Sequence, residues 1–244
     1  MHDDPSAPLF AAALPRTAVA PRRVLCLDAT PEIVALPALG AARVVAVQSW
    51  RPLHDRLRDA GIDTHPEIAD DEGGFDLALV RLGRSRARNL GALAEAITRL
   101  SPDGVLIAAG HNDLGPASHA RSLGAREAIT RFHGRAFWIA RAAAPTDATL
   151  AQWRRATALC RVPPDGHYAS PGGFAWDRVD AGSTLLAETL PADIAGRVAD
   201  LGCGWGYLSL RLTARCPGIV ALDLYEADHA SLQAARRNLE HVPG

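Results

Sequence analysis

Three glycines at alternate positions, Gly202, Gly204 and Gly206, follow the acidic residue Asp200 in this chain of 244 residues. Glycine allows a tight backbone turn and lets a ligand approach the main chain closely. The spacing differs from the dinucleotide fingerprint G-x-G-x-x-G, because Tyr207 stands where the last glycine would be. A glycine loop beside a carboxylate suits a ligand that carries a positive sulfonium centre and a zwitterionic amino acid end.

A second acidic residue, Asp223, ends the apolar run that begins at Ile219. We expect strands over 197–201 and 219–223, so that the glycine loop and Asp223 follow neighbouring strands. A carboxylate at the end of the second strand can accept both ribose hydroxyls of a bound nucleoside. The alternative interpretation is a glycine-rich connector with an acidic residue nearby by chance.

The glycine loop and Asp223 together resemble the cofactor loop of class I S-adenosylmethionine-dependent methyltransferases. The segments 168–174 and 180–186 are similar to the lead-in of the bacterial guanine-N(2)-methyltransferases of small-subunit ribosomal RNA, which reads Pro-Gly-x-Phe and then Asp-x-Gly-Ser or Asp-x-Gly-Thr. This resemblance covers most of residues 23–244 and is most specific between 168 and 226. It implies methyl transfer from S-adenosylmethionine to the exocyclic amine of a guanine in that RNA.

The resemblance also implies roles for single residues. Ser183, together with Asp180 and Gly182, would form a lid close to the cofactor, and Phe174 would lie beside the target base. Asp180 and Ser183 could instead cap a helix that begins there. The other residues implied in cofactor binding are Asp200, Gly202, Cys203 and Gly204 at the methionine part, Gly206 in the same loop, Asp223 at the ribose and Leu224 near the adenine.

The catalytic element of this family, an Asn-Pro-Pro-aromatic stretch, does not occur in the chain. The last residue, Gly244, follows directly after the helix that we expect over 228–239. We therefore expect the Asn-Pro-Pro motif beyond residue 244 and no methyl transfer by these residues alone. Three explanations stay open: a fragment of a longer protein, a frameshifted or truncated product, or a partner chain that completes the second domain.

The elements that must position the loop alternate between short apolar strands and helices, which predicts an α/β fold. We expect two Rossmann-like methyltransferase domains in tandem, the second apparently truncated. Residues 1–22 would be an irregular lead-in, 23–162 a degenerate first domain without a glycine loop, and 163–244 the start of the cofactor-binding domain, with the boundary at the turn over 163–166. In the first domain we predict strands over 24–27, 44–47, 75–80, 105–109 and 133–140, a helix over 89–100 capped by Asn89, and a turn over 102–104.

Composition excludes several classes of protein. The formal net charge is -1, so any contact with RNA must come from a local patch, for which Arg81, Arg84, Arg86 and Arg88 are the candidates. The 4 cysteines include no C-x-x-C pair and the histidines have no metal-ligand spacing, which predicts no metal site and a reducing, cytoplasmic setting. No apolar run reaches the length of a membrane span.

Two other functions stay open. The chain could be a class I methyltransferase that acts on a protein or a small molecule. It could also be a truncated, non-catalytic homologue that binds RNA or the small ribosomal subunit, which the missing Asn-Pro-Pro would favour. Binding of S-adenosylmethionine separates the last alternative from the enzymes.

Overall fold

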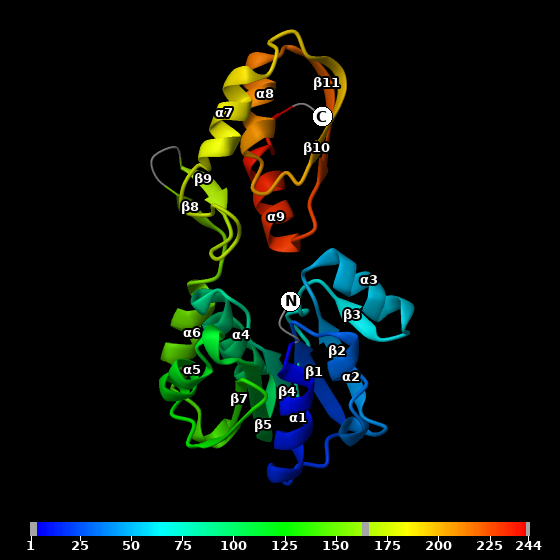
Figure 1. Cartoon of the computed structure of the whole chain (residues 1–244), viewed down its shortest axis with the longest axis vertical. Helices are drawn as coiled ribbons and strands as arrows, with labels where there is room; N and C mark the ends of the chain where they lie inside the picture. Colours follow the sequence, from blue (N-terminus) through cyan, green and yellow to red (C-terminus); the bar gives the residue numbers. More distant parts are fainter. Residues whose placement is uncertain (1–3, 163–165, 243–244) are drawn as a thin grey trace. The chain divides into compact units, whose positions relative to one another are not determined.

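The computed structural model describes residues 4–162 and 166–242. The chain forms two compact units, Met1–Ala156 and Thr157–Gly244, which are described separately (Figure 1). The first three residues of the turn predicted as the domain boundary, 163–165, lie outside the described residues. No helix of the described ranges is long and apolar enough to cross a membrane.

The first unit is built on a seven-stranded sheet with the order β3-β2-β1-β4-β5-β7-β6. The pairs among β1 to β5 are parallel, whereas β7 is antiparallel to both β5 and β6. This topology confirms the predicted α/β fold and adds an antiparallel hairpin at one edge. The strands are β1 Arg23–Leu27, β2 Arg43–Val47, β3 Asp63–His65, β4 Phe75–Arg81, β5 Leu100–His111, β6 Glu127–Arg131 and β7 Gly134–Ala140.

Helices cover both faces of this sheet because its strands are apolar on both sides. Val24 and Cys26 of β1 join one buried cluster, and the alternating Leu25 and Leu27 join the other. Helices α1 to α3 contribute to the first cluster and α4 to α6 to the second. The helices are α1 Ser6–Ala13, α2 Pro31–Val34, α3 Arg51–Asp59, α4 Arg86–Arg99, α5 Pro116–Leu123 and α6 Asp147–Arg155, with short 3-10 turns η1 Leu14–Arg16, η2 Pro37–Leu39, η3 Asn112–Leu114 and η4 Arg141–Ala143.

The expected irregular lead-in is wrong for residues 6–13, which form α1. Leu9 and Phe10 on this helix are fully buried in the first cluster. The prolines before and after the helix suggested irregular chain, but the apolar run between them is long enough for two turns that pack on the sheet.

The predicted cap of α4 is also wrong. The helix begins at Arg86, and the Ser85 side chain accepts a hydrogen bond from the Arg88 amide. Asn89 is buried one turn further on, where its side chain accepts from the Gly83 amide and donates to the Gly83 carbonyl, both at 2.8 Å. Asn89 therefore fixes the loop before the helix and does not cap the helix itself.

The turn expected over 102–104 lies inside β5, which runs from Leu100 to His111. The register between β4 and β5 shifts between Phe75 and Leu77, so the proline-glycine segment is accommodated as an irregularity at the strand's start. At Gly104 a Cβ atom would lie 2.8 Å from the Phe75 carbonyl oxygen, so only glycine fits there.

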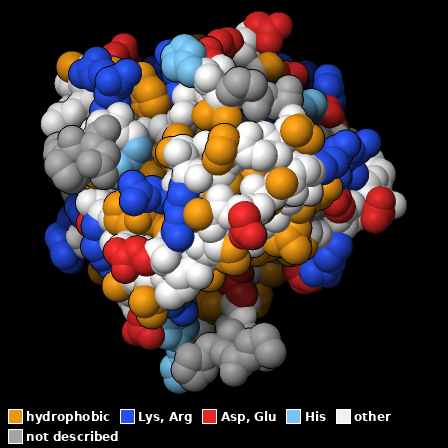
Figure 2. All heavy atoms as spheres, turned by 90° about the horizontal axis from the view of Figure 1, so that it is seen from above, with side chains coloured by type: hydrophobic (Ala, Val, Ile, Leu, Met, Phe, Trp, Pro, Cys, Tyr) orange, Lys and Arg blue, Asp and Glu red, His pale blue; other side chains and the backbone are white. Residues whose placement is uncertain are grey.

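The second unit contains two small sheets and three helices in its described residues. Strands β8 Cys160–Val162 and β9 His167–Ala169 are antiparallel, and β10 Ala195–Leu201 and β11 Gly218–Tyr225 are parallel. The helices are α7 Ala181–Thr189, α8 Tyr207–Arg215 and α9 His229–Asn238. The two strands and the two helices predicted in this part are confirmed, with bounds that differ by up to two residues. On the face shown in Figure 2, acidic and basic side chains are interspersed with hydrophobic ones.

Candidate functional site

The glycine loop lies between β10 and α8, where the sequence placed it. Gly202, Gly204 and Gly206 have φ values of +80°, +55° and +91°, which are unfavourable for any residue with a side chain. The amides of Gly202 and Cys203 both donate to the Tyr225 carbonyl, at 2.8 and 3.0 Å. The loop therefore turns back over the end of β11.

Glu226, the first residue after β11, is the acidic residue that faces this loop. Its Oε2 accepts a hydrogen bond from the Gly204 amide at 2.8 Å, and its Oε1 accepts from the amides of Ala227 and Asp228 at 2.7 and 2.9 Å. Three amide donors hold the carboxylate in one orientation at the carboxyl end of two parallel strands. This is the position at which ligands bind in open α/β sheets.

The prediction that Asp223 ends the strand is wrong, because β11 continues to Tyr225. Asp223 forms a two-point ion pair with Arg197, with Nε–Oδ2 at 2.6 Å and Nη2–Oδ1 at 2.8 Å. The Arg197 hydrogen bonds hold the pKa of the Asp223 carboxyl below its usual range. Asp223 pairs in register with Ala199, one residue away from buried Asp200, so it lies on the opposite face of the strands from the buried helix side. The sequence contains a signal for the longer strand, because the apolar residues Leu224 and Tyr225 follow Asp223 and precede Glu226.

Two other residues of the predicted loop site, Asp200 and Cys203, are buried. Asp200 is buried, and its Oδ2 accepts a hydrogen bond from the Ser209 hydroxyl at 2.6 Å, which ties the end of β10 to α8. Burial, with the carboxylates of Asp200 and Glu226 nearby, raises the pKa of the Cys203 thiol to about 12. A thiol that stays protonated is a poor nucleophile, so Cys203 acts as a small loop residue.

The Asp-x-Gly-Ser motif of the lead-in lies at the start of α7. Asp180 caps α7, and its Oδ2 accepts from the Ser183 amide and hydroxyl at 2.9 and 3.2 Å. The helix-cap interpretation is thus confirmed, and the role of Ser183 at the cofactor stays a prediction. Phe174 is 75% exposed and free to contact a ligand, whereas Leu224 is half-buried beside Asp200 in the strand register.

Asn238 was missed in the sequence and connects the lead-in to the loop. Its Oδ1 accepts from the Tyr168 amide at 2.6 Å, and its Nδ2 donates to the carbonyls of Tyr168 and Trp205, both at 2.8 Å. Trp205 is buried and stacks on His167, with ring centroids 3.8 Å apart. One side chain of α9 therefore fixes β9 and the glycine loop together.

The arginine cluster predicted after β4 is divided in the structure. Arg81 turns inward, where it pairs with Asp28 at 2.8 Å and with Asp4 at 3.1 Å and donates to the Asp28 carbonyl. Arg86 donates to the hydroxyls of Ser118 and Ser122 on α5, and Arg84 is exposed. Arg88 follows in the first turn of α4, half-buried. The four arginines do not form one continuous patch.

The first unit repeats the strand–loop–strand arrangement of the second. Leu27 pairs with Val47 as Leu201 pairs with Tyr225, and the Ala29 amide donates to Val47 as the Cys203 amide donates to Tyr225. The sequence also predicts an internal repeat, in which 23–28 aligns with 197–202 and 44–48 aligns with 219–223. The structure shows that the second of these alignments is wrong by three residues. The structural equivalent of the segment 44–48 is 222–226.

Gln48 occupies in the first unit the position of Glu226. Its Oε1 accepts from the amide two residues on, Trp50, as Glu226 does with Asp228, but its Nε2 donates to the Ala29 carbonyl at 2.7 Å. Asp28 takes the place of Gly202 and retains a positive φ of 54°. The first copy thus keeps the backbone of the loop and lacks the carboxylate and the glycines.

Comparison with known proteins agrees with this geometry. Residues 167–242 match the family model of the methyltransferase small domain. The fold of the chain is that of the T. thermophilus 16S rRNA N2 G1207 methyltransferase, solved in complex with AdoMet and guanosine, with a TM-score of 0.76 at 24% identity over 98% of this chain and 67% of that one. The matched residues lie within the second unit, which is thus similar to the methyltransferase small domain.

Curated relatives narrow the family. The chain is 30% identical to ribosomal RNA small subunit methyltransferase C of Psychromonas ingrahamii over 75% of this chain and 55% of that protein. It is 32% identical to the protein of the same name from Stutzerimonas stutzeri over 70% of this chain and 53% of that protein. The chain is a relative of the ribosomal RNA small subunit methyltransferase C proteins, and it spans about half the length of the relatives it matches.

Proposed function

We propose that the second unit binds S-adenosylmethionine at the glycine loop and Glu226. We propose further that the protein transfers its methyl group to the exocyclic amine of a guanine in small-subunit ribosomal RNA, in the cytoplasm. The observation that carries the proposal is the carboxylate of Glu226, which three amides fix against a loop of positive-φ glycines. The relatives' names and the AdoMet in the T. thermophilus structure support the same cofactor.

Each group at the loop has a part in this proposal. Glu226 would accept the ribose hydroxyls, because its oxygens retain lone pairs after the three amide bonds. Gly202, Cys203, Gly204 and Gly206 would lie against the methionine end, because residues this small let a ligand come close to the main chain. The Asp200 carboxyl would stand behind them with one oxygen already bound to Ser209. The cofactor would supply an electrophilic methyl group for the exocyclic amine of the guanine. Phe174 and Ser183 keep their proposed places beside the base and the cofactor.

The 244 residues contain no Asn-Pro-Pro stretch to orient the amine, so the groups named here supply the cofactor half of the site. We propose that the strand pair of this half is covered by further polypeptide of the same protein or of a partner chain. Leu201 and Tyr225 support this, because they are paired in the register of β10 and β11 and are 78% and 57% exposed. Large apolar side chains grouped on a strand surface are typical of an interaction face.

Titration of the chain with S-adenosylmethionine tests the proposal. We expect Glu226→Gln to weaken cofactor binding by about tenfold or more, because charge-assisted hydrogen bonds to the ribose contribute roughly 1.5–3 kcal/mol. The matched control is Asp223→Asn, which removes the other acidic residue of β11 and should leave the dissociation constant within about twofold, a surface ion pair being weak. Isothermal calorimetry measures both. A larger effect at Asp223 than at Glu226 would restore the assignment made from sequence.

A further inference from the structure

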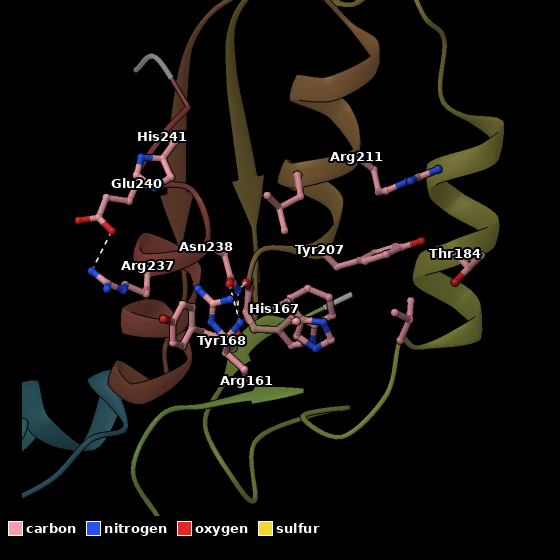
Figure 3. A pocket seen from close by; sticks show the side chains of 14 residues that line it. Arg161, His167, Tyr168, Thr184, Tyr207, Arg211, Arg237, Asn238, Glu240 and His241 are labelled. Atoms are coloured by element: carbon pink, nitrogen blue, oxygen red, sulfur yellow. Dashed lines mark hydrogen bonds and ion pairs between the residues drawn. The ribbon is translucent and has the colours of Figure 1, made fainter. Parts of the chain in front are cut away.

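The second unit contains a cavity of about 620 Å³ that the proposed cofactor site does not use (Figure 3). Residues of β8, β9, α7, α8 and α9 line it. Trp205 is the member of the glycine loop in its wall; within the described ranges, Gly202, Gly204 and Glu226 are not among the lining residues. The cavity thus lies beside the loop as a separate space.

Cationic side chains dominate this cavity. Arg161 of β8, Arg211 of α8 and Arg237 of α9 line it, with Glu240 as the acidic residue among the lining residues described. Glu240 pairs with Arg237 at 2.8 Å, and no carboxylate of the described ranges forms an ion pair with Arg161 or Arg211. The cavity therefore has a local excess of positive charge, although the net charge of the chain is -1.

Tyr168 brings two of these arginines together. The guanidinium carbons of Arg161 and Arg237 lie 5.0 and 5.4 Å from the centre of its ring. Hydrogen bonds from the two guanidinium groups hold the pKa of the Tyr168 hydroxyl below its usual value. Two like charges side by side repel each other, and a doubly hydrogen-bonded anion between or beside them relieves this repulsion.

The position of Tyr168 is itself fixed. The Asn238 side chain binds both its amide and its carbonyl and also the Trp205 carbonyl, so the Tyr168 main chain is tied to α9 and to the glycine loop. Arg211 extends from α8 toward α7, away from the other two, so cations lie on separate sides of the cavity (Figure 3).

We propose that this cavity binds phosphate groups of an RNA backbone. Guanidinium groups match phosphate geometry with two parallel hydrogen bonds. Separate cationic positions suit successive phosphates of one strand better than a single free ion, and this favours RNA over inorganic phosphate. The identity of the RNA as ribosomal rests on the proposed function, whereas the phosphate contact rests on the cavity alone.

Fluorescence anisotropy of a labelled single-stranded RNA oligonucleotide with the 244-residue chain tests this. We expect Arg211→Gln, and separately the pair Arg161→Gln with Arg237→Gln, to weaken RNA binding by about tenfold. We also expect the slope of log K against log salt to fall by about 0.7 for each phosphate that the variant no longer binds. The control is Arg236→Gln, which removes the same charge from an exposed position on α9 outside the cavity and should change affinity by less than about twofold.

Three further measurements keep the result decisive. Circular dichroism melts establish whether the variants fold. If the double variant does not fold, Arg211→Gln alone tests the proposal, because Arg211 forms no ion pair in the described structure. RNA affinity unchanged in Arg211→Gln overturns the proposal, and so does binding of inorganic phosphate by the cavity with RNA affinity unaffected. The dissociation constant of S-adenosylmethionine should be the same in these variants as in the wild-type chain. If the wild-type chain does not bind the cofactor, the result contradicts the proposed function and leaves the proposal about the cavity unaffected.

Discussion

At the scale of single residues, a shift of three positions decides which carboxylate faces the glycine loop. Asp223 and Glu226 both end in a carboxylate and both lie near the end of β11. Asp223 is neutralised by Arg197 on the face of the strands, whereas Glu226 is held by amides at their edge. Because side chains alternate between faces along a strand, an error of one residue in its end already changes the face assigned to a side chain.

Cys26 gives a prediction about pH at this scale. Burial, with the carboxylate of Asp28 as a smaller cause, raises the pKa of this thiol to about 12 in the folded protein, above its value in the unfolded chain. The folded state therefore binds more protons above about pH 9, and stability is lost as pH rises toward 12. We expect the free energy of unfolding to fall by about 1.4 kcal/mol per pH unit on account of this thiol. Urea titrations at pH 9 and 11 should show a shallower fall in Cys26→Ala than in the wild type.

An equal fall in the free energy of unfolding between pH 9 and 11 in the two proteins would mean that Cys26 does not contribute to the pH dependence of stability. The comparison uses the change between two pH values, so a constant loss of packing in the variant does not affect it.

At the scale of elements, the first unit depends on polar side chains that fix loops at the carboxyl ends of its strands. Asn89 holds the loop between β4 and α4, and Gln48 holds the loop after β1. In the second unit Asn238 and Glu226 do the same for β9 and the glycine loop. These amide and carboxylate side chains supply partners to loop backbone that the sheets leave unpaired.

Asn89→Ala should therefore be more destabilising than the loss of the helix cap. We expect a cost of about 2–3 kcal/mol, because the buried amide and carbonyl of Gly83 lose their partner. The matched variant Ser85→Ala removes the actual cap and should cost about 1 kcal/mol. Chemical denaturation of the chain measures both values. If Ser85→Ala proved the costlier change, the contacts of Asn89 with Gly83 would not be the main support of this loop.

At the scale of the whole molecule, the two units share one strand–loop–strand arrangement but have different residues in its loop. The first unit has a seven-stranded sheet, and Asp28 and Gln48 lie at the loop after β1. At the equivalent positions the second unit has Gly202 and Glu226. Gln48 and Glu226 are at equivalent positions of the two units. Of these two residues, Glu226 carries the negative charge that would accept hydrogen bonds from two ribose hydroxyls. We infer that cofactor binding stabilises the second unit and not the first.

Differential scanning calorimetry with and without S-adenosylmethionine tests this inference. We expect separate transitions for the two units, since each has its own contacts. At about 100 times the dissociation constant, the cofactor should stabilise the second unit by roughly 2.7 kcal/mol and leave the first unchanged. A shift of the first unit's transition would mean that Gln48 and Asp28 still form a binding site. Glu226→Gln provides the control, because it should remove the shift.

The sequence by itself determined the α/β class, most strands, a minority of the helices and the glycine loop, because each depends on periodicity or on spacing within a short segment. The resemblance carried by segments 168–186 and 200–223 also identified the family to which the chain is related. The tertiary structure decided which acidic residue faces the loop, that residues 6–13 form a buried helix, and that Asn89 fixes a loop. It also brought Arg161, Arg211 and Arg237 to one cavity. Each of these depends on strand register or on contacts between segments far apart in the chain, which local patterns do not contain.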